Sequence, residues 1–84
     1  MKLYRLTQDK VRGYDTYDSC IVCAKSKKDA RTIHPYDNYD DAIDWEFDDR
    51  DTWCRYVEDV EVEFLWEAKK DIKRGVIVSS FNAG

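Results

Sequence analysis

The sequence predicts an α+β fold: a small antiparallel sheet of about four strands with one short helix packed on it, in the order β-β-α-insert-β-β. Two extended runs at each end of the chain and a single capped helix between them support this prediction. The composition is 43% hydrophobic with three Trp and six Tyr, which is typical of a folded domain. We expect residues 1–84 to form a single domain.

The N-terminal part predicts two strands separated by a loop. Lys2–Thr7 carries Leu3, Tyr4 and Leu6 and predicts the first strand. Gln8–Asp18 is polar and contains a glycine, which indicates a long loop. Residues 19–25 (SCIVCAK) form a short, continuous, β-branched apolar run, and this pattern is typical of a strand that is buried on both sides.

Residues 26–34 predict the helix. Ser26 is a favourable N-cap, and Asp29 three positions later completes an S-x-x-D capping-box pattern. Pro35 ends the helix because proline disfavours the α conformation in the preceding residue. A helix of about two turns is not stable alone, so we expect it to pack on the sheet.

The C-terminal part predicts two more strands. Residues 57–68 alternate between apolar and acidic side chains, with Leu65 as the exception, which indicates a half-buried strand with one acidic face. Residues 69–74 form a basic turn, and Gly75–Phe81 is the last strand. Strand–turn–strand at both ends of the chain predicts two antiparallel hairpins. The expected core residues are Cys20, Val22, Val60, Val62, Phe64 and Ile77.

The net charge of −4 is unevenly distributed along the chain. Residues 1–34 hold eight Lys/Arg against four Asp/Glu, residues 35–68 hold two against thirteen, and residues 69–84 hold four against one. The basic patch at the helix start is small in a molecule that is acidic overall, so we expect a solvated face there and no direct nucleic-acid binding.

The segment 37–51 contains eight carboxylates in fifteen residues, opposed only by Arg50. Aromatic residues lie between these carboxylates, whereas disordered acidic tails lack aromatics. The spacing fits a strand from residue 43 onward and a loose helix equally. The segment therefore predicts an ordered negative surface that binds a basic protein or imitates a nucleic-acid backbone. The alternative is an acidic surface that only keeps the protein soluble.

Catalytic, metal and membrane functions find no support in the sequence. Cys20 and Cys23 lie three apart within an apolar strand, so their sulfurs face opposite sides and are expected to be core thiols. His34, the only histidine, has no adjacent nucleophile. An odd number of cysteines favours a reducing compartment, and neither a signal peptide nor a membrane span is recognisable. We expect a cytoplasmic protein with no cofactor, no metal and no enzymatic activity.

Several segments together resemble a family of small phage and prophage proteins without an assigned activity. They are GYDTYDS (13–19), ARTIHP (30–35), WC (53–54), VEVEFLWEA (60–68) and RGVIVSSFNAG (74–84). The resemblance covers most of the chain and is thinnest at 36–51, and it transfers no catalytic residues. It implies a role typical of small acidic phage proteins, which often inhibit CRISPR and other host defence systems.

The first functional hypothesis is a phage-type inhibitor in the host cytoplasm that occludes a basic, nucleic-acid-binding surface of a host protein. Carboxylates would set association rate and specificity, and aromatics would anchor the complex. The expected partner-binding residues are Asp37, Asp40, Asp41, Asp44, Trp45, Glu46, Phe47, Asp48, Asp49, Asp51, Trp53, Glu61 and Glu63.

The second hypothesis is a protein that binds or sequesters a small ligand or a nucleotide, and a structural interaction module is a further alternative. The rim of a ligand pocket would include Tyr14, Asp15, Tyr17 and Asp18, together with the C-terminal Ser79–Asn82. Asp beside Gly in a loop is, however, most often a turn residue. The sequence predicts neither the target nor the oligomeric state.

Overall fold

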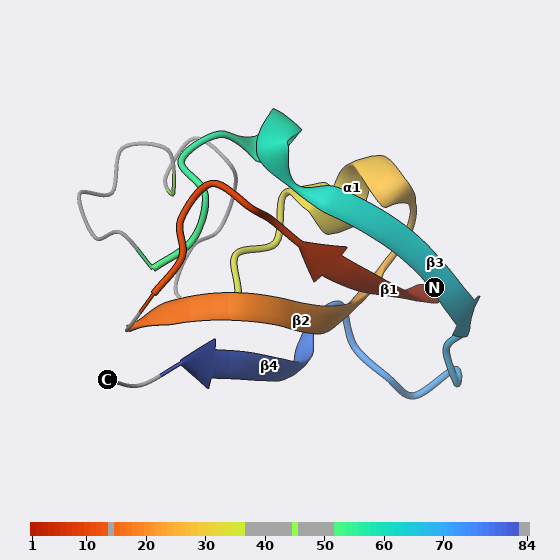
Figure 1. The fold of residues 1–84 in the computed structure, drawn as a ribbon. Helices are drawn as coiled ribbons and strands as arrows, with labels where there is room; N and C mark the ends of the chain where they lie inside the picture. The colour runs from red at the N-terminus through yellow and green to blue at the C-terminus, as the bar shows by residue number, and fades with distance from the viewer. Residues whose placement is uncertain (14, 37–44, 46–51, 83–84) are drawn as a thin grey trace.

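The computed structural model describes residues 1–13, 15–36, 45 and 52–82, and in these residues it has the expected α+β architecture (Figure 1). The elements in chain order are β1 (Lys2–Thr7), β2 (Thr16–Ala24), α1 (Lys27–Arg31), the short 3-10 helix η1 (Val57–Asp59), β3 (Glu61–Glu67) and β4 (Gly75–Asn82). β2 starts earlier than the sequence predicts, α1 is shorter, and the first residues of the expected third strand form η1.

The strands form one antiparallel sheet in the order β3-β1-β2-β4. β1 and β2 form the expected N-terminal hairpin. The second expected hairpin is wrong, because β3 pairs with β1 and β4 pairs with β2, so the two C-terminal strands flank the N-terminal pair (Figure 1). The segment between them crosses from one edge of the sheet to the other. β3 and β4 are therefore both edge strands.

One face of the sheet carries the core. Tyr4 and Leu6 of β1 lie opposite Val22 and Cys20 of β2, and all four side chains are buried. α1 packs on this face and contacts β1, β2 and β3. The remaining buried members of the core cluster are Ala24, Ala30, Ile33, Trp45, Trp53, Cys54 and Val60. The other face of the sheet, which carries Arg5 and Ile21, is called the open face below.

The expected core is confirmed only in part. Cys20, Val22 and Val60 are buried, and Val62 is half-buried against the core. Phe64 and Ile77 are wrong as core residues, because 45% and 48% of their surfaces are exposed. Both lie on edge strands, and a five-residue helix is too short to cover the sheet to its edges.

A bulge explains why the alternation of β3 fails as a guide to burial. The pairing of β1 with β3 shifts between Leu3 and Tyr4, so Tyr4 lies opposite Phe64 while Leu3 lies opposite Trp66. Phe64 consequently stays on the core face, with its ring 5.9 Å from that of Tyr4, at the margin of the core. Trp66 is carried to the open face beside Leu3 and is 61% exposed.

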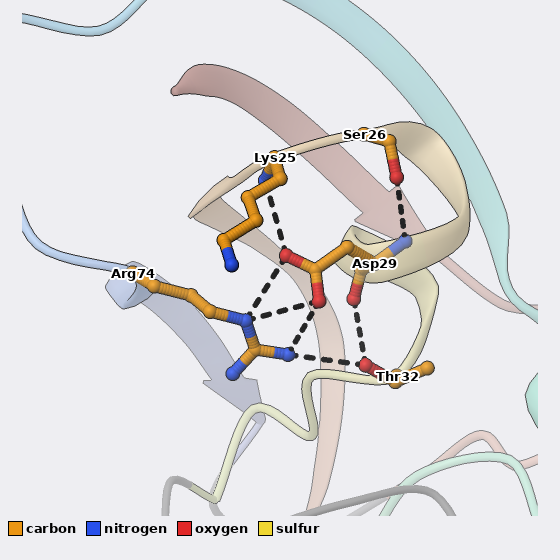
Figure 2. Close-up of polar contacts among 5 residues, drawn as sticks. All are labelled: Lys25, Ser26, Asp29, Thr32 and Arg74. Carbon is orange, nitrogen blue, oxygen red and sulfur yellow. Dashed lines mark hydrogen bonds and ion pairs between the residues drawn. The ribbon is translucent and has the colours of Figure 1, made fainter.

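A cluster of hydrogen bonds fixes α1 and attaches it to the start of β4 (Figure 2). The hydroxyl of Ser26 accepts from the backbone N–H of Asp29 at 3.1 Å, which confirms the predicted N-cap. The Asp29 carboxylate accepts from the backbone N–H of Lys25 at 3.0 Å, one residue before the position that a capping box uses.

Asp29 also pairs with Arg74, 45 positions later in the chain. The Arg74 Nε lies 3.0 Å from both carboxylate oxygens, and its Nη2 lies 2.9 Å from Oδ1 and 3.2 Å from the hydroxyl of Thr32. The hydrogen bond from Arg74 lowers the pKa of Asp29 below its usual value, and partial burial opposes this only in part. Because Arg74 directly precedes β4, this pair joins the helix to the start of β4.

Candidate functional site

The strongest candidate surface among the described residues is the acidic edge, which we define as Glu58, Glu61, Glu63 and Glu67. All four side chains are exposed. Glu61, Glu63 and Glu67 belong to β3, which occupies one end of the sheet, and Glu58 lies in η1 directly before it. The edge position follows from the strand order, so the carboxylates line a border that no other described strand covers.

Glu61 and Glu63 point to the open face. They lie opposite Thr7 and Arg5, whose positions alternate with those of the buried Leu6 and Tyr4. Because the two residues are two positions apart on one strand, their Cα atoms are separated by about 6.6 Å. The two predicted site residues that the structure describes on β3 are therefore brought together on one accessible surface.

Neighbouring cations neutralise the acidic edge only in part. Arg5 lies opposite Glu63 and Lys2 opposite Glu67, so each of these carboxylates has a cation across the strand pair. Glu61 has Thr7 opposite, whose hydroxyl donates to its carboxylate at 3.5 Å. Only two of the four carboxylates thus face a cation across the strand pair, so the edge keeps an excess of negative charge.

A hollow of about 360 Å³ lies against the two carboxylates and is lined by Arg5, Thr7, Glu61, Val62 and Glu63. Its charged walls suit a polar or cationic group better than an apolar ligand. Arg5 and Thr7 were absent from the predicted site. The sequence does indicate that both face away from the core, because they alternate with Tyr4 and Leu6. Only the pairing of β1 with β3 places them beside the carboxylates.

The two predicted tryptophan anchors are core residues in the structure. Trp45 and Trp53 are each 3% exposed, and their rings lie 5.0 and 6.5 Å from the ring of His34. They cover the part of the sheet that α1 is too short to reach, so in this arrangement they are not accessible to a partner. The other predicted residues of the acidic segment lie outside the described residues: Asp37, Asp40, Asp41, Asp44, Glu46, Phe47, Asp48, Asp49 and Asp51.

The described residues of the predicted ligand rim lie in a turn and along β2. Asp15 has a positive φ of 61°, typical of a turn, and its N–H donates to the carbonyl of Asn82. The Tyr17 ring packs against Phe81 at 4.8 Å, which makes it part of the contact between β2 and β4. Asp18 is exposed, and Tyr14 lies outside the described residues.

The cysteines and the histidine are packed inside the protein. Burial raises the pKa of the Cys20 thiol to about 12 and is the main cause of a similar rise, to about 12, for Cys54. Cys23 is fully buried and its thiol donates to the carbonyl of Ile72 at 3.8 Å. His34 is 5% exposed, and its Nδ1 accepts from the N–H of Tyr36 at 2.9 Å. These positions match the prediction of core thiols.

Searches of the described ranges found no group of three or more potential metal ligands and no helix long and apolar enough to cross a membrane. Comparison of the chain with family models, curated proteins and solved structures gave no match. The functional conclusion therefore depends on the geometry and charge of the acidic edge.

Proposed function

We propose that this protein is a stoichiometric inhibitor that binds a basic, nucleic-acid-binding surface of a host protein through the acidic edge. The observation that carries the proposal is the exposed pair Glu61 and Glu63, which share one face of an edge strand, with Glu58 and Glu67 along the same border. Two exposed carboxylates on one face of a strand are a suitable imitation of a short stretch of phosphate backbone.

The spacing of the carboxylates supports the imitation. Same-face residues of a strand repeat at about 6.6 Å, whereas phosphates of one DNA strand advance about 3.4 Å along the helix axis. Glu61 and Glu63 thus correspond to every second phosphate. A cationic groove that accepts phosphates would accept these side chains, and the charges would chiefly increase the association rate and the specificity.

The acidic segment 37–51 extends the same charge in sequence. Its last carboxylate, Asp51, comes seven residues before Glu58, and the residues between them include one exposed cation, Arg55. We include this segment in the proposed binding surface. From the resemblance of the sequence to small phage proteins, we further propose a target in a host defence system, such as a CRISPR effector, in the bacterial cytoplasm.

The proposal is tested by neutralising the acidic edge. Glu61→Gln/Glu63→Gln preserves shape, and Asp18→Asn/Asp71→Asn is the control, because it removes the same charge from exposed positions away from Glu61 and Glu63. Immobilised wild-type protein would first capture its target from bacterial lysate, and nucleic acid would be used as a competitor. The purified target would then be measured against each variant at low and high salt.

We expect the edge variant to associate with the target about 3–10-fold more slowly at low salt, with a flatter salt dependence, while the control stays near wild type. Changing Asp40, Asp41, Asp44, Asp48 and Asp49 to Asn should slow association by about tens-fold. Equal rates for wild type and both variants would show that these carboxylates are only a solvated surface. If nucleic acid does not release the target from the immobilised protein, the imitation of a phosphate backbone is contradicted.

The hollow beside Glu61 favours small-ligand binding as a second candidate. Among the described lining residues Arg5 is the only cation, so it is the residue that would hold the anionic group of a nucleotide, against the repulsion of Glu61 and Glu63. A nucleotide that raises the melting temperature of wild type, but not of Arg5→Met, would support this candidate. An unchanged melting temperature across nucleotides would eliminate it.

A further inference from the structure

The outer edge of β4 is the second border of the sheet, and it differs from the acidic edge. β4 is last in the strand order, and within the described ranges no strand pairs with its outer side (Figure 1). Ile77, Val78 and Phe81 are 48%, 55% and 46% exposed. Residues 75–82 contain no charged side chain. An exposed, apolar, uncharged edge strand is a template for pairing with another strand.

The two edges are protected unequally. β3 carries Glu61, Glu63 and Glu67, and charges on an edge strand prevent pairing with a second copy of the same edge. Two β4 strands would meet without like-charge repulsion. In a protein of net charge −4, β4 is therefore the border at which two copies can approach most closely.

We propose that two copies of this chain pair antiparallel through β4 and form a continuous eight-stranded sheet. A two-fold axis at Ser79 places Val78 opposite Ser80 of the second copy. The regular pairing is centred on residues 78–80, because the pairing of β4 with β2 shifts at Ile77. Val78 and Ser80 both belong to the open face, since they lie opposite Ile21 and Ser19. This register consequently joins the open faces of the two copies into one surface.

Charge at the ends of β4 agrees with the antiparallel orientation. Lys73, an exposed cation, lies just before β4, whereas Asp15 is hydrogen-bonded to Asn82 at the opposite end of the strand. Antiparallel pairing brings the basic start of β4 in one copy to the end that holds Asp15 in the other. A parallel arrangement would instead bring the basic ends together.

The dimer extends beyond the proposed inhibitory function. The order of the combined sheet is β3-β1-β2-β4-β4-β2-β1-β3, so the two acidic edges lie at its far borders and both remain accessible. One dimer would therefore present two separate binding edges. The dimer does not depend on the existence of a target, so it can be tested with the purified chain alone.

The test is the mass in solution of the full chain and of two matched variants. One chain has a mass of 10.0 kDa, so the wild type should sediment with twice this mass at concentrations up to about 100 μM. Val78→Lys introduces a charge at the exposed β4 edge and should give the mass of one chain. Trp66→Lys makes the same kind of change at an exposed residue near the other edge and should remain dimeric.

A wild type with the mass of one chain throughout this range would overturn the proposal, and so would dimers of Val78→Lys as stable as those of wild type. Circular dichroism and a thermal melt of each variant establish that it is folded. An extended segment of a target protein could also add to β4, but the purified chain would then be a single copy, which is the overturning result.

A cysteine cross-link tests the register independently of mass. Residues directly opposite in an antiparallel pair have Cα atoms about 4.5–5.5 Å apart, within the range of a disulfide. Ser79→Cys should form a disulfide-linked dimer under a mild oxidant, because Cys20, Cys23 and Cys54 are buried and do not compete. Ser80→Cys is the control, since this residue lies opposite Val78 and not opposite its own copy. Equal cross-linking of both variants, or of neither, would overturn the register centred on Ser79.

Discussion

Arg74→Met should destabilise the fold by detaching α1 from the start of β4. The substitution keeps most of the side-chain length but removes the contacts of the guanidinium with the Asp29 carboxylate and the Thr32 hydroxyl. The side chains of Arg74 and Asp29 are 38% and 25% exposed. Their contribution to stability should therefore lie between that of an exposed ion pair, about 0.2–1 kcal/mol, and that of buried charged hydrogen bonds, about 1.5–3 kcal/mol. We therefore expect a loss of about 1–2 kcal/mol. A chain of this length has a stability of about 4–13 kcal/mol, so the loss is measurable.

The same loss should depend on pH, with a defined sign. Arg74 lowers the pKa of Asp29 in the folded state, so the contribution is complete above the pKa of the unfolded chain, about 3.9. It disappears as the pH falls through the lower folded pKa, because the protonated carboxyl no longer attracts the guanidinium. The difference between wild type and Arg74→Met should thus be largest near neutral pH and shrink below about pH 4.

Urea denaturation at a series of pH values measures both effects. Lys73→Met is the matched control, because it removes one cation from the adjacent exposed position. Asp29→Asn should cost a similar amount at pH 7, and the double variant should cost little more than either single variant. A difference between wild type and Arg74→Met that is constant with pH, or equal for Lys73→Met, would refute the assigned role of the pair.

Two further expectations follow from burial. Leu6→Ala should cost about 2–5 kcal/mol in denaturant unfolding because Leu6 is fully buried, whereas Phe64→Ala at the exposed margin should cost clearly less; equal costs would contradict the position of the core. Cys20 and Cys54 should not react with a thiol reagent at pH 8 until the protein is unfolded, because burial keeps both protonated. Since their folded pKa values exceed that of a free thiol, stability should fall as the pH rises above about 9, and constant stability between pH 8 and 11 would contradict this.

The elements were predictable from the sequence because their signals are local. Ser26 and Asp29 act within one helical turn, and the apolar run at 19–25 and the alternation of residues 57–68 indicate strands without reference to the rest of the chain. The order of the strands was not predictable. A short basic turn between the last two strands suggests a hairpin, but β3 and β4 pair instead with opposite edges of the N-terminal pair. This pairing joins residues that are distant in the chain, so no local pattern reveals it.

The depth of burial was also beyond the sequence. Alternation assigns a residue to a face, and Phe64 is indeed on the core face, yet burial requires something to cover it. The helix has only five residues, so tryptophans from the acidic part of the sequence supply the missing cover. Trp45 and Trp53 looked like binding anchors because they lie among carboxylates, but the nearest apolar surface available to them belongs to their own chain.

Glu61 and Glu63 have two physical consequences, and the structure shows how they can be separated. As charges of any sign, they discourage pairing at the β3 edge; as negative charges, they would attract the basic target that we propose. Glu61→Lys/Glu63→Lys keeps the first property and reverses the second, whereas Gln at both positions removes both. The Lys variant should consequently form assemblies of the same size as wild type and should fail to bind the target. The Gln variant should bind the target more slowly and should tend to associate beyond a dimer. If the Lys variant binds the target as fast as wild type, the sign of the charge at the β3 edge has no role in recognition. The charges on β3 would then serve only to prevent pairing there, which leaves β4 as the edge that pairs.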